Sequence, residues 1–240
     1  MTFITIDGWQ WIDYERLGST NDEAKKLIGK NTPLVVTAKK QTSGRGRMGH
    51  KWIGLDGNLF MSLGVDWNSD NTNILALISS LALLLSVKSY AATLNPMLKW
   101  PNDILVNKRK ISGILLEVAS SSKVIIGIGV NIKASPELEK NSPYLSTSLK
   151  ELGIDTDRLD FMRTYLHIFA ETINLYHQAG AQKIIDMWLS YAHKIGQEIT
   201  VKGEKTQICG KFIGLDKQGM LLLKTPDNEI RTISAGDIYF

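Results

Sequence analysis

The sequence predicts an α+β fold, in which a mixed, largely antiparallel sheet packs against helices and a small β-barrel or sheet follows. Several strand-like segments occur in succession in the middle of the chain, which is typical of an α+β sheet rather than a doubly wound one. Apolar residues then recur at helical spacing between positions 159 and 192. From Gln197 onward, short β-branched segments alternate with turn residues, as in small barrels.

The first quarter of the chain predicts strands and one helix. The helix is expected to begin near Thr20, because Thr20 and Glu23 fit a capping box, and to end at Gly29. The expected strands are Ile4–Ile6, Leu34–Ala38 and Leu59–Leu63, and a basic, glycine-rich loop covers residues 39–56.

A long apolar helix is expected over residues 74–92. The stretch from Asn71 to Val87 carries no charge but includes three serines and two asparagines, and it is shorter than the ~20 apolar residues of a membrane span. We therefore expect a buried core helix and no contact with a membrane.

The second half of the chain predicts strands, a surface loop, two helices and a second group of strands. A domain boundary is expected near Ile195, which gives domains at 1–195 and 196–240. The expected elements are strands Met97–Trp100, Ile104–Val106, Ile111–Val118 and Val124–Val130, a hairpin turn at 107–110, a surface loop at 134–148, helices at 159–178 and 181–192, and tail strands at 199–201, 207–215, 219–223 and 230–233.

Composition limits the possible functions. The 240 residues carry a formal charge of only +4, which is too mild for a dedicated nucleic-acid binder but suits an anionic ligand. A single cysteine, Cys209, excludes an intrachain disulfide, and the first residues do not resemble a signal peptide. We therefore expect a cytoplasmic protein.

The loop from Gly44 to Gly49 formally matches the dinucleotide-binding pattern G-x-G-x-x-G. That pattern should open a helix, but His50 to Gly54 and Asp56 to Asn58 do not resemble a helix start. The loop lacks the Gly-Lys-Ser/Thr of a Walker A motif, and the chain lacks the further motifs of a kinase. Glycines that expose backbone N–H groups, with Arg45 and Arg47 nearby, favour binding of a carboxylate or phosphate. A flexible basic surface loop is the alternative.

Three further segments could carry chemistry. Lys99-Trp100-Pro101-Asn102-Asp103 places a carboxylate at a strand end, where Asp103 could hold a magnesium ion or form only an Asx turn. Lys110 begins a strand, and Gly113 within that strand indicates close approach of a ligand or only a bulge. Gly127 and Gly129 leave one strand face open, for a ligand or for packing. The four histidines lack metal-ligand spacing.

Taken together and in this order, these segments resemble the biotin–protein ligases over essentially the whole chain. The residues that carry the resemblance are Ser19-Thr20-Asn21, Gln41, Gly44-Arg45-Gly46-Arg47-x-Gly49, Lys51-Trp52, Lys99-Trp100-Pro101-Asn102-Asp103, Lys110-x-x-Gly113-Ile114-Leu115, Gly127-x-Gly129-x-Asn131 and, in the tail, Gly214 to Gly219. The resemblance implies a class II synthetase-like catalytic domain followed by an SH3-like barrel.

The resemblance also implies a two-step reaction. Biotin and ATP, with Mg²⁺, would give biotinyl-AMP and pyrophosphate, and the adenylate would then acylate one lysine of a carrier domain, the biotin carboxyl carrier protein of acetyl-CoA carboxylase. Neither step needs a protein nucleophile, so catalysis would consist of positioning and charge neutralisation.

Individual roles follow from the same resemblance. Lys110 and Arg47 would stabilise the reacting carboxylate and phosphate, and Asp103 is a candidate metal ligand. The implied biotin-binding residues are Ser19, Thr20, Asn21, Gln41, Gly44, Arg45, Gly46, Arg47, Trp52, Lys110, Gly113, Leu115 and Gly127. The implied ATP-binding residues are Arg45, Arg47, Lys51, Trp52, Asn102, Asp103, Lys110 and Asn131.

Met48 and His50 stand where many members of this family carry arginine, so we expect faster loss of the adenylate than in more basic relatives. A lipoate–protein ligase or octanoyl transferase is the nearest rival, and the Gly-Arg-Gly-Arg-x-Gly loop argues against it. A DNA-binding regulator is not expected, because only 18 residues precede Ser19. A non-catalytic interaction module formed by the β-strand tail is a third alternative, but the tail is too short to explain the other 195 residues. A homodimer formed through an exposed sheet edge is possible.

Overall fold

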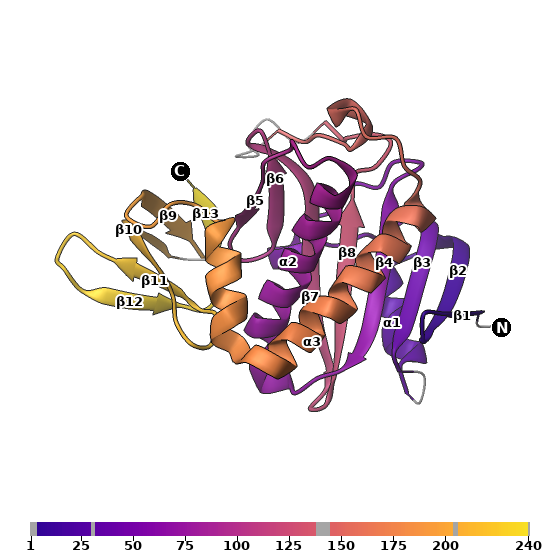
Figure 1. Cartoon of the computed structure of the whole chain (residues 1–240), viewed down its shortest axis with the longest axis horizontal. Coiled ribbons are helices and arrows are strands. Elements are labelled where there is room, and N and C mark those ends of the chain that lie inside the picture. The colour runs from indigo at the N-terminus through magenta and orange to yellow at the C-terminus, as the bar shows by residue number, and fades with distance from the viewer. Residues whose placement is uncertain (1–3, 30–31, 138–144, 204–205, 240) are drawn as a thin grey trace.

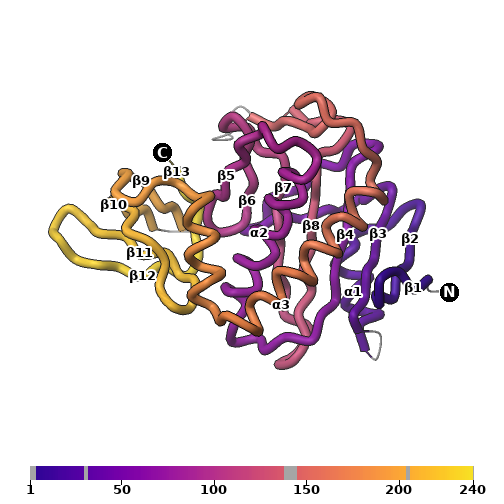
Figure 2. The backbone as a smooth tube through the Cα atoms, viewed as in Figure 1, coloured from indigo at the N-terminus to yellow at the C-terminus, as the bar shows by residue number. Residues whose placement is uncertain are grey.

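The chain folds around two β-sheets in the computed structural model, which describes residues 4–29, 32–137, 145–203 and 206–239. An eight-stranded sheet and its helices form the larger part, and a five-stranded sheet projects from one end (Figure 1). The backbone trace in Figure 2 shows the N-terminus at the far end of the large sheet from the small one.

The large sheet is mixed and largely antiparallel, as the sequence predicts. Its strand order is β1-β2-β3-β4-β8-β7-β6-β5, and β2 and β3 are its parallel pair. The strands are β1 Ile4–Ile6, β2 Trp9–Leu17, β3 Leu34–Gln41, β4 Leu59–Asp66, β5 Pro96–Lys99, β6 Asp103–Val106, β7 Arg109–Ser120 and β8 Lys123–Val130.

The central strand β8 shows how the sequence gives the two faces of this sheet different tasks. Side chains alternate along a strand, and Ile126 and Ile128 enter the main core with helices α2 (Thr72–Tyr90) and α3 (Arg158–Ser190). On the opposite face, Ile125 packs beneath helix α1 (Thr20–Leu27) in a smaller core. Gly127 and Gly129 continue that second face beyond α1, and their missing side chains leave room there.

Helix α2 is the buried core helix that its composition predicts. It lies against the sheet beside α3 (Figure 1), and its isoleucines and all of its leucines except Leu85 are almost fully buried. Within the described ranges, one helical stretch, at residues 69–90, is long and apolar enough to cross a membrane, and 67% of its most apolar window is buried here. Helix α3 is broken at Gly180, where φ is +77°, so the two predicted helices are confirmed as its two halves.

Two sequence predictions need correction, and two strands are not predicted at all. Strand β2 is not predicted, because charged residues in its second half interrupt the apolar pattern. The capping box is wrong: Ser19 is the N-cap, and the Thr20 hydroxyl donates to Gln41 instead of capping the helix. Residues 138–144 of the predicted surface loop lie outside the described residues, and Ser146–Ser148 are buried rather than exposed. Strand β13, at the end of the tail, is also not predicted.

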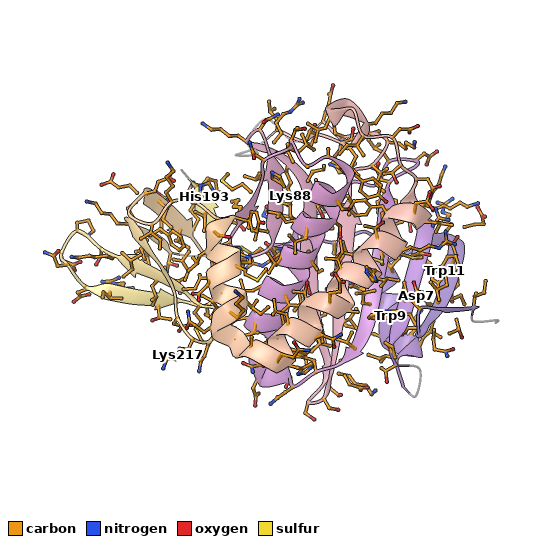
Figure 3. The ribbon with its side chains drawn as sticks, viewed as in Figure 1. Asp7, Trp9, Trp11, Lys88, His193 and Lys217 are labelled. Atoms are coloured by element: carbon orange, nitrogen blue, oxygen red, sulfur yellow. The ribbon has the colours of Figure 1, made fainter. Side chains whose placement is uncertain are left out.

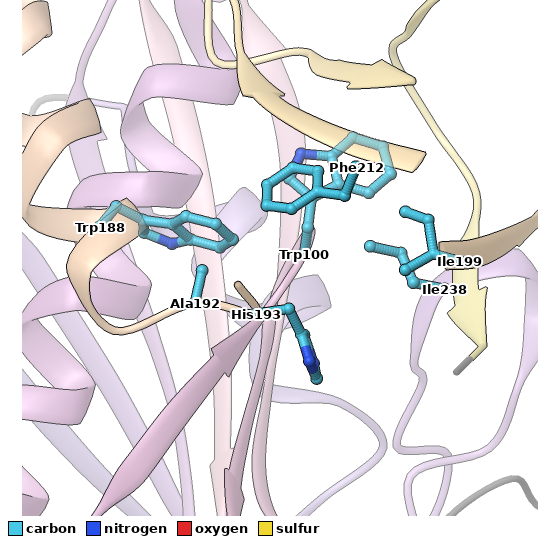
Figure 4. Close-up of a pocket in the computed structure, with 7 residues that line it drawn as sticks. All are labelled: Trp100, Trp188, Ala192, His193, Ile199, Phe212 and Ile238. Atoms are coloured by element: carbon cyan, nitrogen blue, oxygen red, sulfur yellow. The ribbon is translucent and has the colours of Figure 1, made fainter. Parts of the chain in front are cut away.

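The small sheet packs against the end of the large one. Trp100, Trp188 and Phe212 meet at the junction around a void of about 10 Å³ (Figure 4). His193 lies at the same junction, between the end of α3 and the small sheet (Figure 3). The strands are β9 Glu198–Lys202, β10 Gln207–Leu215, β11 Leu221–Lys224, β12 Ile230–Ile233 and β13 Asp237–Tyr239, in the order β12-β11-β10-β9-β13. The boundary at residue 195 stays a prediction.

Candidate active site

A cavity of about 620 Å³ opens on the glycine face of β7 and β8, beside the start of α1. The glycine–arginine loop, the turn between β5 and β6, and β13 of the small sheet form its other walls. The predicted site residues that line it are Ser19, Thr20, Asn21, Gln41, Arg45, Gly46, Arg47, Lys51, Trp52, Asn102, Asp103, Lys110, Gly113, Leu115, Gly127 and Asn131. Among the predicted residues Gly44 does not line the cavity. A Cβ there would meet the backbone oxygen of Trp52 at 2.8 Å, so its role is to let the loop pack closely.

One end of the cavity is lined by polar side chains that carry no charge. The Gln41 side-chain oxygen accepts from the Thr20 backbone N–H at 2.8 Å and from its hydroxyl at 3.1 Å. Ser62, buried on β4, lies 2.6 Å from Asn21 Oδ1 and 2.7 Å from Thr20 Oγ1. A wall of fixed, neutral donors and acceptors suits an uncharged polar ring.

Glycines on β7 and β8 make space for two side chains that a larger residue would displace. A Cβ at Gly127 would lie 2.2 Å from Asn21 Oδ1, and a Cβ at Gly129 would lie 2.3 Å from the Trp52 indole. A Cβ at Gly113 would lie 3.2 Å from the same indole. Trp52 therefore sits on a flat glycine surface, which forms the floor of an apolar slot beside the polar end.

The two loop arginines are held on opposite walls. Arg45 forms a bidentate pair with Asp22 on α1, at 2.8 and 2.6 Å. The hydrogen bonds from Arg45 lower the pKa of Asp22, and Asp22 raises the pKa of Arg45. Arg47 turns to the small sheet, where it donates to the Gly236 carbonyl at 3.3 Å and lies 3.8 Å from Asp237. Burial lowers the pKa of Arg47, and Asp237 and Asp103 partly oppose this.

Lysines gather around Asp103 at the other end of the cavity. Lys110 Nζ lies 2.7 Å from one carboxylate oxygen, and Lys99 Nζ lies 3.9 Å from the other. Lys99 is buried, and that burial lowers its pKa while Asp103 opposes the shift. Together with Arg47, these lysines give this end an excess of positive charge suited to an anion.

The predicted asparagines and Lys51 also shape the loop and the cavity wall. Asn102 accepts a 3.5 Å hydrogen bond from Arg47 and donates to the Ile114 carbonyl. Asn131 is almost fully buried, and its amide donates to Thr147 at 3.1 Å. The backbone of Lys51 pairs with the backbone of Arg45 in an isolated antiparallel β-bridge, which folds the loop back on itself.

Several cavity residues escape prediction from motifs. Lys99, at the end of β5, has no role assigned from the motif that contains it, and Ser62, on β4, contacts the polar wall without itself lining the cavity. Asp237 and Tyr239 come from the unpredicted strand β13, at least 91 residues along the chain from the other lining residues. His50 and Ser146 also line the cavity. The Lys99 that precedes Trp100 in the quoted motif was the one available signal.

The donor set is not that of a dedicated metal site. No group of three His, Cys, Asp or Glu side chains that could hold a metal occurs in the part of the chain that is described. Asp103 already pairs with two lysines, so it is not a complete metal site by itself. A magnesium ion fits here if phosphate oxygens of a nucleotide supply further ligands, which is the usual way in which proteins bind Mg²⁺. The role of Asp103 as a ligand stays a prediction.

Comparisons with known proteins identify the family. The profile of the Biotin/lipoate A/B protein ligase family matches residues 14–131, and that of the Biotin protein ligase C terminal domain matches residues 194–240. The "Bifunctional ligase/repressor BirA" of Bacillus subtilis is 34% identical over 97% of this chain and 74% of its own length. The "Biotin--[acetyl-CoA-carboxylase] ligase" of Paracoccus denitrificans is 31% identical over 94% of this chain and 98% of its own.

Solved structures agree with this assignment. The biotin protein ligase of Aquifex aeolicus, in complex with biotin and ATP, superposes with a TM-score of 0.82 at 28% identity, covering 95% of this chain and 97% of that one. These matches extend over both sheets and include the loop, strands and β13 that surround the cavity, and the chain belongs to the biotin protein ligase family.

Proposed function

We propose that this protein activates biotin with ATP and transfers the biotinyl group to a lysine of a biotin carboxyl carrier protein, the acceptor of acetyl-CoA carboxylase. The observation that carries the proposal is the division of one cavity into a neutral polar end, an apolar slot and a cationic end. These three parts match the ureido ring, the aliphatic chain and the carboxylate of biotin in that order.

The neutral end is proposed to bind the ureido ring. Thr20 and Gln41 are fixed by their mutual hydrogen bonds and can present a donor and an acceptor without rearrangement. Ser19 and Asn21 complete this wall, while Leu115 and the glycines at 113 and 127 border the aliphatic chain. Trp52 would cover that chain from the loop side.

The cationic end is proposed to hold the reacting groups. In the first step, a biotin carboxylate oxygen attacks the α-phosphorus of ATP, the bond to pyrophosphate breaks, and pyrophosphate leaves. Lys110 and Arg47 offset the repulsion between the two anions and stabilise the charge that develops. Bound Mg²⁺ would neutralise phosphate charge. Lys51, Asn102, Asp103 and Asn131 are proposed on the nucleotide side, and Arg45 and Gly46 from the loop would enclose the adenylate.

The second step needs an amine and no protein nucleophile. The acceptor lysine attacks the acyl carbon of biotinyl-AMP, an amide bond forms, and AMP leaves with the electron pair of the broken bond. Cys209, the one cysteine, lies exposed on the small sheet and outside the cavity lining. The name of the Paracoccus relative supports a carboxylase carrier as acceptor.

We further propose a cytoplasmic enzyme that neither represses transcription nor binds membranes, and that can dimerise through a sheet edge. The mild charge of +4 supports the absence of DNA binding and hence of a repressor role. Salt-sensitive, sequence-specific binding to DNA would contradict it.

The decisive experiment measures ATP-dependent transfer of labelled biotin to a purified carrier domain. Calorimetry with biotin and with lipoate separates this proposal from lipoate ligation. Tight binding of lipoate, or no transfer of biotin with ATP and Mg²⁺ present, would exclude the proposed function.

A further inference from the structure

Glu117 lies just outside the cavity, at the point where the polar wall and the arginine loop come closest. It follows Gly113 and Leu115 on the same face of β7, because alternate residues of a strand share a face. Its side chain is 22% exposed, so its carboxylate is partly shielded from solvent. It does not line the cavity, and the motif Lys110-x-x-Gly113-Ile114-Leu115 ends two residues before it.

One carboxylate here meets donors from two separate elements. Glu117 Oε2 accepts from Asn21 Nδ2 at 2.6 Å, and Oε1 lies 3.1 Å from Lys25 Nζ, both on α1. Arg45 Nη2 of the loop lies 3.6 Å from Oε2 while it holds Asp22 at 2.6 Å. Glu117 therefore touches both the polar wall and the loop.

The contact with Asn21 determines how the polar wall is arranged. An amide that donates through Nδ2 to Glu117 must turn Oδ1 the other way, and Oδ1 faces the Ser62 hydroxyl at 2.6 Å. A serine hydroxyl has one proton and Asn21 Oδ1 can only accept, so this proton is committed to Asn21. Ser62 Oγ also contacts Thr20 Oγ1 at 2.7 Å, and Thr20 binds Gln41. Glu117 thus orients Asn21 and, through it, the hydroxyl of Ser62, which lies beside Thr20, one of the groups proposed to read the ureido ring.

The contact with Arg45 acts on the loop instead. Asp22 and Glu117 place two carboxylates beside one guanidinium, and both belong to the wall on which α1 lies. Holding Arg45 there holds the loop segment that carries Gly46 and Arg47 over the cavity, where it would retain the adenylate.

We propose that Glu117 is a positioning residue that serves both steps: through Asn21 it orients the biotin-reading hydrogen bonds, and through Arg45 it retains the loop over biotinyl-AMP. We call the contact with Asn21 the wall arm and the contact with Arg45 the loop arm. The inference rests on the proposed function, because it assigns biotin to the wall arm and biotinyl-AMP to the loop arm. Its test requires substitutions that affect the two arms differently.

Glu117→Gln and Glu117→Ala separate them. Glutamine keeps an oxygen that accepts from Asn21 but loses the charge that attracts Arg45, whereas alanine removes both contacts. We expect Glu117→Gln to bind biotin as the wild type does and to release biotinyl-AMP several-fold faster. We expect Glu117→Ala to release it equally fast and also to bind biotin about 10-fold more weakly.

Salt provides a readout that a purely structural role would not move. Added salt screens an ion pair at a partly exposed site, so adenylate release from the wild type should accelerate with ionic strength. Release from Glu117→Gln should be fast already at low salt and should rise less steeply with salt than release from the wild type, because only the pair between Arg45 and Asp22 is left to be screened. Glu229→Gln, which removes an exposed ion pair to Arg231 in the small sheet, is the matched control and should match the wild type.

The measurements are biotin calorimetry without ATP and a chase of preformed, labelled biotinyl-AMP, with thermal unfolding as the check on folding. Unchanged biotin affinity in Glu117→Ala together with unchanged adenylate release in both variants would refute the inference. If Glu117→Ala does not fold, unchanged release and unchanged salt dependence in Glu117→Gln refute the loop arm. A wild type that fails to form biotinyl-AMP refutes the proposed function itself, so the two failures are distinguishable.

Discussion

Gly129→Ala adds one methyl group beneath Trp52 and tests whether the glycine surface of β8 seats the loop. The new Cβ would lie 2.3 Å from the indole Cε2, 2.5 Å from Cζ2 and 2.6 Å from Nε1. Carbon atoms in ordinary contact are about 3.5–4.0 Å apart, so the indole must move by more than about 1 Å.

The cost of this displacement falls on the loop rather than on the sheet. Gly129 already has a backbone conformation that alanine can adopt, and the atoms in conflict belong to Trp52, a side chain of the loop. Overpacking of this kind costs about 1–3 kcal/mol, which corresponds to about a 5- to 150-fold weakening of whatever depends on the seated loop. We therefore expect weaker retention of biotinyl-AMP by that factor and a nearly unchanged unfolding temperature.

The assay is a chase of labelled biotinyl-AMP combined with thermal unfolding. Gly29→Ala is the matched control, because a Cβ there meets no heavy atom within 4 Å. Trp52→Ala and the double variant Gly129→Ala/Trp52→Ala complete a cycle. Once Trp52 is gone, the added methyl group should have no further effect on release. Wild-type retention by Gly129→Ala, or equal losses with and without Trp52, would refute the reasoning.

Four further predictions follow. Lys110→Ala should lower biotin-dependent pyrophosphate release strongly without unfolding the protein, and an unchanged rate of release would contradict its proposed role. Omission of Mg²⁺ should abolish pyrophosphate release but leave biotin calorimetry unchanged, and weaker biotin binding would point to a protein-held ion instead. Phe212→Ala should lower the free energy of unfolding in denaturant by about 3–5 kcal/mol, because a buried aromatic at the junction of the sheets is lost, and a loss under 1 kcal/mol would argue against that packing. Burial, with Lys99 nearby, lowers the pKa of His193 from 6.5 to about 4. Between these pH values His193 is protonated in the unfolded chain but not in the folded one, so the free energy of unfolding should fall as pH falls. His193→Gln should flatten the free energy of unfolding measured across this pH range.

Prediction from sequence succeeds where a pattern is local. The strands β5 to β8 and the core helix α2 are each built around short apolar runs, and Gly180 marks the break in α3. Strand β2 escapes because Asp13, Glu15 and Arg16 interrupt its second half, where the structure leaves side chains exposed. A search for apolar residues does not detect a strand such as β2, whose second half is exposed to solvent.

The site divides in the same way. The glycine–arginine loop and Lys110 are recognisable from their motifs, since anion chemistry requires those residue types together. Glu117 and Asp237 are not, because each acts through a partner that only the folded chain brings near. The pairing of Arg45 with one wall and of Arg47 with the other likewise has no sequence signal, since two arginines two residues apart look equivalent until the strands are placed.

Strand β13 has a practical consequence for work on this protein. Asp237 and Tyr239 border the cavity, so a segment that follows this strand closely starts beside the proposed catalytic centre. The N-terminus lies at the opposite end of the large sheet (Figure 1). Affinity tags and surface-immobilisation anchors are therefore best attached at the N-terminus, and activity lost on C-terminal tagging should return when the tag is cleaved.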